Sequence, residues 1–142
     1  MNKLFLILCS VFLACGLIKK PELSETELII SLQRTACFGT CPIYKIEIYT
    51  DGSGTYTGTR FVENIGFSKF QLSKSDINKI LEYAKKIGFS KLKDEYFEPI
   101  TDLPTTYITI KDKQVKDYTG APKKLKNLEK LIDKIYLQTI SN

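Results

Sequence analysis

The chain has 142 residues and a formal net charge of +5, with 43% hydrophobic and 26% charged residues. This length predicts one domain, and the balance of apolar and charged residues is typical of a globular protein. The sequence contains no His. His is the commonest general base at neutral pH and the commonest metal ligand, so its absence excludes Ser-His-Asp and Cys-His sites and most familiar enzyme classes.

The first 14 residues have the pattern of an export signal. Lys3 precedes an apolar run from Leu4 to Ala14, which only Ser10 interrupts. A run of about 11 residues is too short to span a bilayer, for which a helix needs about 20. The segment Phe12-Leu13-Ala14-Cys15-Gly16 resembles the lipobox of bacterial lipoproteins, although Phe12 stands where that family prefers an aliphatic residue. The resemblance implies cleavage before Cys15 and lipidation of its thiol; ordinary secretion with cleavage near Ala14 is the alternative.

Acyl chains on Cys15 would anchor the mature chain to a membrane. Residues 16–26 lack hydrophobic periodicity and predict a flexible tether. No Asp follows Cys15 to indicate retention in the inner membrane. We therefore expect a lipid-anchored protein of the cell envelope, at the outer membrane and facing the periplasm or the surface. The predicted organisation is a signal peptide over 1–14, a lipidated Cys and tether over 15–26, and a single domain over 27–142.

Cys37 and Cys41 are the cysteines that remain once Cys9 leaves with the signal peptide and Cys15 carries lipid. In an oxidising envelope the two should form a disulfide. A redox-active pair is the alternative, but such pairs generally have two intervening residues and a helix start that lowers a thiol pKa. Here three residues intervene and a strand-like segment follows, so we favour a structural bond. Zinc needs four ligands, and we predict no metal site.

The sequence around these cysteines also resembles a known family. The run Arg34 to Tyr44, which contains CFGTCPIY, is followed by Ile48-Tyr49-Thr50-Asp51-Gly52 and later by Thr101-Asp102-Leu103-Pro104-Thr105. Together these segments resemble a family of bacterial envelope domains described only as a domain of unknown function, over most of residues 28–138. The resemblance implies a single α+β domain and transfers no catalytic residue.

Hydrophobic periodicity predicts six strands and two helices. The strands are expected near 28–32, 44–48, 54–62, 67–72, 105–110 and 114–118. A three-residue loop at Asp51-Gly52 is expected to set Ile48 opposite Tyr56, and the second hairpin to turn at Asp112-Lys113. Ser73 should cap a helix that ends before Gly88, and Pro122 should open the last helix. The predicted fold class is α+β, a mainly antiparallel sheet of about six strands with two helices on one face.

Four residues are candidates for binding: Phe38, Gly39 and Thr40 in the cysteine loop, and Asp102. The side chain of Phe38 either packs back on the sheet, which we favour, or faces a partner. Asp102 is expected to close a turn on backbone N–H groups.

The acidic residues Asp94, Glu95, Glu98 and Asp102 could supply the carboxylate pair of a glycoside hydrolase. We favour instead a loop that contains Asp94 and Glu95, with Tyr96 and Phe97 returning to the core. No catalytic residue and no cofactor is predicted.

Between Lys111 and Lys134 the sequence has eight Lys against four acidic residues, a net charge of +4. This run is either a face that meets anionic lipid headgroups or polysaccharide, or a solvated helix surface, which we favour. The expected compartment disfavours nucleic acid as a partner.

These observations predict a non-catalytic envelope lipoprotein, an interaction or scaffold module held to the membrane by its lipid anchor, with an envelope protein or a glycan as its partner. The alternatives are a thiol-disulfide protein that uses Cys37 and Cys41, a carboxylate hydrolase that uses Asp102, and a small-ligand or glycan-binding module.

Overall fold

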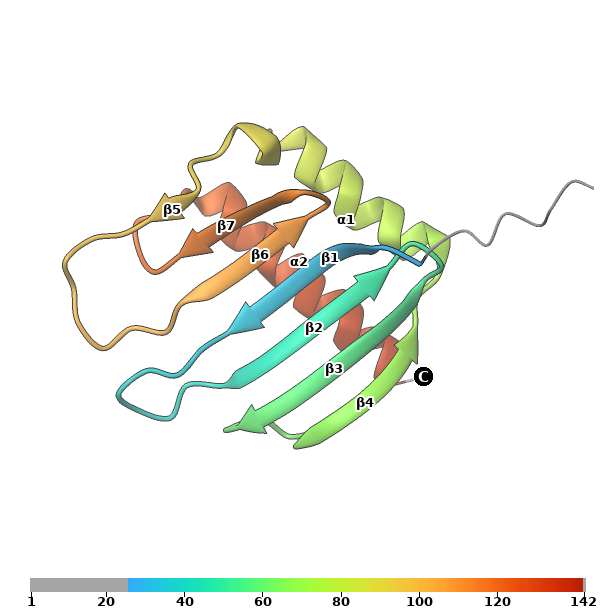
Figure 1. The fold of residues 1–142 in the computed structure, drawn as a ribbon, viewed down its shortest axis with the longest axis horizontal. Helices are drawn as coiled ribbons and strands as arrows, with labels where there is room; N and C mark the ends of the chain where they lie inside the picture. Colours follow the sequence, from blue (N-terminus) through green and yellow to red (C-terminus); the bar gives the residue numbers. More distant parts are fainter. Residues whose placement is uncertain (1–25, 142) are drawn as a thin grey trace, which may run out of the picture.

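The computed structural model describes residues 26–141, so the predicted signal peptide, Cys15 and most of the tether lie outside the described residues. Seven strands form one sheet in the order β4-β3-β2-β1-β6-β7-β5 (Figure 1). The elements in chain order are β1 (Leu28–Arg34), β2 (Ile43–Tyr49), β3 (Ser53–Arg60), β4 (Gly66–Gln71), α1 (Lys74–Lys86), the short 3-10 helix η1 (Phe89–Lys91), β5 (Glu95–Tyr96), β6 (Thr106–Ile110), β7 (Lys113–Asp117) and α2 (Lys123–Ile140).

The predicted α+β class is confirmed, with seven strands in place of about six. Neighbouring strands are antiparallel except β5, which pairs in parallel with β7. Both helices lie behind the sheet in Figure 1, on one of its faces. No helix among residues 26–141 is long and apolar enough to cross a membrane.

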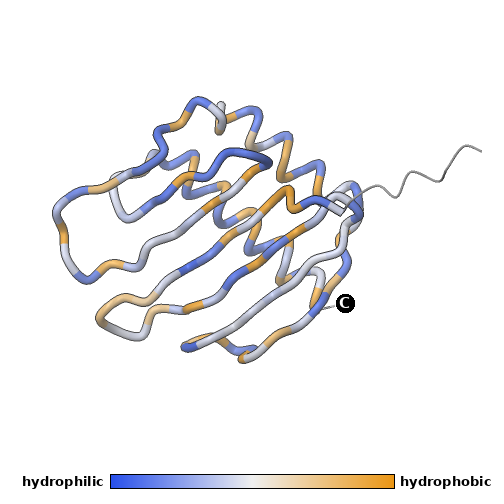
Figure 2. Tube along the Cα trace, in the orientation of Figure 1, coloured by the Kyte–Doolittle hydropathy of each residue, from blue (hydrophilic) through white to orange (hydrophobic). Residues whose placement is uncertain are grey.

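The core lies between the sheet and the helices because apolar residues alternate along the strands and recur at helical spacing in α1 and α2 (Figure 2). Ile30 and Leu32 of β1 are fully buried at the centre of the sheet. The helices contribute a buried row to the same core: Ile77, Ile80, Ala84, Leu125, Leu128, Ile132 and Ile135.

The helix ends follow their sequence signals. Ser73 is the N-cap of α1, where its side chain accepts a hydrogen bond from the backbone N–H of Asp76. Gly88 has φ 69° and ψ 42° after the helix, a left-handed conformation that glycine adopts without strain. α2 begins directly after Pro122, as predicted.

Three details of the sheet differ from the prediction. Ile48 lies opposite Gly54, and Tyr56 lies opposite Ile46, because the three-residue loop 50–52 joins the end of β2 to the start of β3 without the predicted bulge. The second hairpin turns at residues 111–112 rather than 112–113, because Ile110 pairs with Lys113. β3 ends at Arg60 and does not extend to 62.

The connections divide the molecule into two ends. The loops 35–42, 61–65 and 97–105 lie at one end of the strands, which we call the loop end (left and lower edge in Figure 1). The opposite end, which we call the turn end, holds the turns 50–52 and 111–112 and the start of β1. The backbone N–H of Lys111 donates to the carbonyl of Ile29 over 2.8 Å, which fixes the second of these turns beside the start of β1.

Candidate functional site

The loop between β1 and β2 is closed by its two cysteines. The Sγ atoms of Cys37 and Cys41 lie 1.93 Å apart, at disulfide distance. The side chain of Phe38, between them, is 91% exposed. We expected Phe38 to pack back on the sheet, and this was wrong. The short loop closed by Cys37 and Cys41 therefore presents the ring to solvent.

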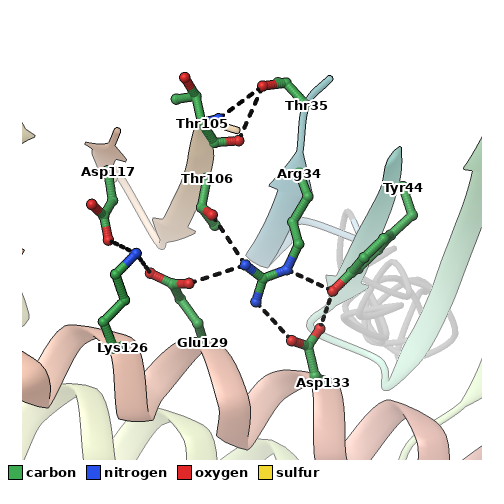
Figure 3. Close-up of polar contacts among 9 residues, drawn as sticks. All are labelled: Arg34, Thr35, Tyr44, Thr105, Thr106, Asp117, Lys126, Glu129 and Asp133. Atoms are coloured by element: carbon green, nitrogen blue, oxygen red, sulfur yellow. Dashed lines mark hydrogen bonds and ion pairs between the residues drawn. The ribbon is translucent and has the colours of Figure 1, made fainter. Parts of the chain in front are cut away.

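The cysteine loop is attached to the loop 97–105. Thr35 donates its backbone N–H to the carbonyl of Thr105 over 3.0 Å, and its hydroxyl accepts the backbone N–H of Thr105 over 3.0 Å. The same hydroxyl is 3.2 Å from the carbonyl of Thr105 (Figure 3). Two segments that are 70 residues apart in the sequence are therefore held side by side at the loop end.

The loop 97–105 is in turn supported by Tyr118. The ring of Phe97 stacks on the ring of Tyr118, with centroids 5.4 Å apart, and the Tyr118 hydroxyl donates to the carbonyl of Ile100. Phe97 is 61% exposed, so the expectation that it returns to the core was wrong. Asp102 has φ 68°, and its carboxylate makes no hydrogen bond within residues 26–141, so it does not close a turn as expected.

Exposed apolar side chains gather at the loop end. They come from all three loops: Phe38, Phe61, Ile65, Phe97, Ile100 and Leu103. Scattered exposed apolar residues are ordinary, but a group of large ones on neighbouring loops marks an interaction surface. Phe38, Gly39, Thr40 and Asp102, the candidates from the sequence, all belong to this end and are exposed.

The acidic residues proposed as a hydrolase pair do not converge. Asp94 forms an ion pair with Lys113, and Glu95 forms one with Lys116 over 2.7 Å. Each carboxylate is thus paired with a separate lysine of β7, the strand next to the edge strand β5. Within the described chain, no group of three or more His, Cys, Asp and Glu side chains could hold a metal ion.

A network of charged side chains lies directly below the loop end, between the sheet and α2 (Figure 3). Arg34, the last residue of β1, follows Ile30 and Leu32 on the inner face. Its guanidinium donates to Glu129 over 3.2 Å and to Asp133 over 2.8 Å. It also donates to the hydroxyls of Tyr44 and Thr106, which lie opposite Arg34 on the neighbouring strands.

A second cation extends the network. Lys126 lies 2.5 Å from the fully buried carboxylate of Asp117 and 3.6 Å from Glu129. The Tyr44 hydroxyl donates to Asp133 over 2.6 Å. Two cations therefore face three carboxylates, and these contacts join α2 to β1, β2 and β7.

Burial changes the acidity of these groups. It raises the pKa of Glu129 from 4.5 to about 7, against the opposing effect of Lys126, and the carboxylate of Asp117 adds to the rise. Burial and the charge of Asp133 raise the pKa of Tyr44. Burial lowers the pKa of Arg34, but the Tyr44 and Asp133 oxygens more than offset this effect and raise it. Tyr44 and Arg34 consequently keep their protons at neutral pH.

This chemistry is that of a structural clamp. A carboxyl with a pKa near 7 is a suitable general acid or base, but the side chain of Glu129 is only 3% exposed and cannot reach a substrate. Asp133 and Tyr44 satisfy Arg34 and each other. The sequence pattern did not predict the network, because Glu129 and Asp133 belong to the charged run that we assigned to a solvated helix surface. The signal was present in their spacing of four residues, next to the buried stripe of α2.

A cavity of about 280 Å³ opens beside the clamp at the loop end. Tyr44 and Asp133 form one wall, shared with the clamp, and Phe61 and Glu63 of the β3–β4 loop form another. The rings of Tyr56 and Tyr136 also line it and stack on each other with centroids 4.8 Å apart. The structure thus contains a concave surface lined by four aromatic residues.

Comparison with known protein families matches residues 28–136 to a domain of unknown function, DUF6438. The chain belongs to this family. The matched segment begins with β1 and ends within α2, so it includes the cysteine loop and the whole clamp. Membership agrees with the expected resemblance to a domain of unknown function. No curated protein matches the chain.

Proposed function

We propose that this DUF6438 protein is a non-catalytic lipoprotein of the bacterial cell envelope, whose domain binds a protein partner through its loop end. The observation that carries the proposal is the 91% exposure of Phe38 on a loop closed at disulfide distance. A large apolar side chain held in water is unfavourable unless a partner covers it.

The loop end is ordered before any partner arrives. The cysteine pair restricts the loop 35–42, and the Thr35 and Thr105 contacts join it to the loop 97–105. Fixing loops in advance lowers the conformational entropy lost on binding. This arrangement supports recognition better than catalysis, because Arg34, Tyr44 and Asp133 below it are hydrogen-bonded to one another and the carboxylate of Glu129 is buried.

Charge indicates the chemistry of the partner. The loops 35–42, 61–65 and 97–105 contain Glu63, Glu98 and Asp102 and no Lys or Arg. An apolar and acidic surface is complementary to an apolar and basic one. We therefore expect a protein with exposed apolar and basic side chains at the site of contact.

Site-specific photo-crosslinking in intact cells tests this function. A crosslinker at Phe38 or at Phe97 should give the same discrete adduct. The yield of this adduct should decrease when Glu98 is replaced by Gln and Asp102 by Asn in the same chain. A crosslinker at Lys130, which is exposed on α2, serves as the matched control. The proposal is wrong if the loop positions give no adduct or the same adducts as Lys130.

The anchor is tested separately. Replacing Cys15 with Ala should abolish labelling by a fatty-acid precursor and leave the chain unprocessed or free of membranes. A substituted chain that still behaves as a lipid-modified, mature-sized species would contradict the lipobox assignment while leaving the loop-end proposal intact.

The aromatic cavity favours a second candidate function, binding of a small ligand or glycan. Rings of Tyr and Phe pack against the apolar faces of sugars, and Glu63 offers a hydrogen-bond acceptor. NMR titration with a panel of sugars should shift the Tyr44 and Tyr136 signals, and Phe61→Ala should weaken the effect. Unchanged spectra across the panel would exclude a glycan among those tested.

A further inference from the structure

A broad groove runs between the C-terminal half of α1 and the turn that joins β6 to β7. Its volume is about 1040 Å³. Five lysines line it against two acidic residues, Glu82 and Asp112, which leaves a net charge of +3: Lys85, Lys86, Lys91, Lys111 and Lys113. We call this surface the lysine groove.

Most of these lysines have no counter-ion in the described chain. Lys113 is paired with Asp94, but the side chains of Lys85, Lys86, Lys91 and Lys111 are exposed and form no ion pair with any residue in 26–141. By contrast, Lys116 and Lys126, which also belong to the lysine-rich run of the sequence, are paired with Glu95 and Asp117. The lysine-rich run also places four exposed lysines without an ion pair on α2: Lys123, Lys124, Lys130 and Lys134. The groove differs from that helix surface because its four unpaired lysines come from α1, η1 and the β6–β7 turn and line one concave surface.

The backbone of Lys111 adds to this argument. Lys111 has φ 52°, a conformation in which glycine is preferred and a lysine is strained. The turn 111–112 nevertheless places a cation at the rim of the groove. The sequence thus has a charged residue at a position where backbone conformation disfavours it.

The lysine groove lies close to the point where the chain enters the domain. The N–H of Lys111 is bonded to the carbonyl of Ile29, the second residue of β1. The 12 residues from 16 to 27 separate Cys15 from β1. Fully extended, they reach at most about 40 Å. The loop end lies at the other end of the same strands (Figure 1).

We propose that the lysine groove docks on anionic phospholipid headgroups of the membrane that holds the anchor, and so directs the loop end away from the bilayer. The inference rests on the proposed lipidation of Cys15. An anionic membrane surface attracts each nearby Lys enough to raise binding about fivefold, so four unpaired lysines give a strong bias once a tether keeps them near the surface. The acidic loop end would be repelled by the same surface.

The test uses the chain with the N-terminus that it has in cells, purified and added to phosphatidylcholine vesicles with or without phosphatidylglycerol. Mass spectrometry of that N-terminus reports lipidation independently. If the chain is lipidated, it is reconstituted and energy transfer is measured from a dye at Ser90, in the groove, or at Thr40, at the loop end, to a dye on the bilayer. If it is not, vesicle co-sedimentation is measured instead.

Phosphatidylglycerol should bring the Ser90 dye closer to the bilayer and leave the Thr40 dye distant, and high salt should remove the difference. Replacing Lys85, Lys86, Lys91 and Lys111 with Gln should abolish this response. The matched control replaces Lys69, Lys74, Lys130 and Lys134, which are exposed elsewhere, and should retain most of it. Thermal melting verifies that both variants fold.

Three results would overturn the inference. One is energy transfer that is the same with neutral and with anionic vesicles. For an unlipidated chain, the equivalent result is co-sedimentation that is the same with both kinds of vesicle. Another is an equal loss of the response in both sets of four substitutions, which would indicate net charge alone. The third is a response to vesicles that carry lipopolysaccharide but none to phosphatidylglycerol, which would assign the groove to an anionic polysaccharide. If the chain is not lipidated but its co-sedimentation depends on the groove lysines, the result would contradict the lipid anchor and support headgroup binding by the lysine groove.

Discussion

The two ends of the sheet carry opposite chemistry on one scaffold. At the loop end, three loops supply six exposed apolar side chains and three acidic residues without a Lys or Arg. Near the turn end, the lysine groove has five lysines against two acidic residues. The net charge of +5 for the whole chain describes neither surface. Strands of 5 to 8 residues separate the two ends, so one end can face a membrane while the other faces a partner.

The two ends also differ in how they are held. Tight turns of two and three residues form the turn end. The loop end has longer connections, and it depends on the cysteine pair, the Thr35 and Thr105 contacts and the clamp around Arg34 below it. Substitutions that weaken these devices should therefore affect the loop end first.

The largest effect is expected from Arg34→Ala. This change leaves Glu129 and Asp133 without their shared cation in a largely buried setting. Breaking a buried ion pair from one side costs roughly 3–5 kcal/mol, so the free energy of unfolding should fall by about that amount. Arg34→Lys should lose less, because it keeps the charge but not the planar fork. Urea denaturation measures both.

Arg60→Ala is the control for Arg34. Arg60 is also an arginine at a strand end beside the loop end, but it is exposed and its contact is with the ring of Phe61 at 4.9 Å. An exposed contact of this kind contributes about 0.5–1 kcal/mol. If the two alanine variants lose the same stability, the clamp does not hold the loop end.

A pH dependence follows from Glu129. Its pKa is raised from 4.5 to about 7, so between these values the folded chain keeps a proton that the unfolded chain releases. The free energy of unfolding should therefore fall as the pH rises from about 4.5 to 7, by on the order of 2–3 kcal/mol, and level off above that range. Glu129→Gln, which mimics the protonated form, should lack this slope. Urea denaturation across the range measures it, and parallel profiles for both chains would contradict the assignment.

The clamp shows where sequence patterns stop being informative. The strands, caps and helix stripes were predictable because each depends on neighbours within a few residues, as with Ser73 and Asp76. Arg34 continues the alternation of Ile30 and Leu32, yet a charge is ordinarily assigned to the surface. Its burial is favourable because of partners on other elements, among them Glu129 and Asp133 of α2, which are 95 and 99 residues away.

Two other differences have the same origin. The strand β5 has 2 residues, too few for a periodic pattern, and it forms because β7 offers an edge to pair with. The exposure of Phe38 depends on which elements surround the cysteine loop, and the local sequence does not contain that information. By contrast, the cysteine pairing was predictable because the two cysteines are only four residues apart in the sequence.

The cysteine pair should contribute less than the clamp. Replacing both Cys37 and Cys41 with Ser should lower the free energy of unfolding by on the order of 2 kcal/mol and leave the domain folded, because the closed loop is short. The yield of the crosslinked adduct from Phe38 should decrease by a larger fraction than the free energy of unfolding, because the loop loses its fixed shape. As a structural bond, the pair should have a reduction potential below about −300 mV against a glutathione series and should not reduce insulin. A higher potential or insulin turnover would promote the thiol-disulfide alternative.

The smallest expected effect is at Lys111, and it has the opposite sign. Glycine adopts the φ of 52° without the steric conflict of a Cβ, so Lys111→Gly should raise the free energy of unfolding by roughly 0.5–1 kcal/mol, after the larger entropy of the unfolded glycine is subtracted. Asp112→Gly is the control: Asp112 has no positive φ, so the same change in the same turn should destabilise the domain. Chemical denaturation of both variants measures the difference.

If Lys111→Gly stabilises the fold while it weakens the response to phosphatidylglycerol, the lysine is retained for its charge, at the expense of the stability of the turn. If it destabilises the fold, Lys111 has a structural role there, and the strain argument for the groove is wrong.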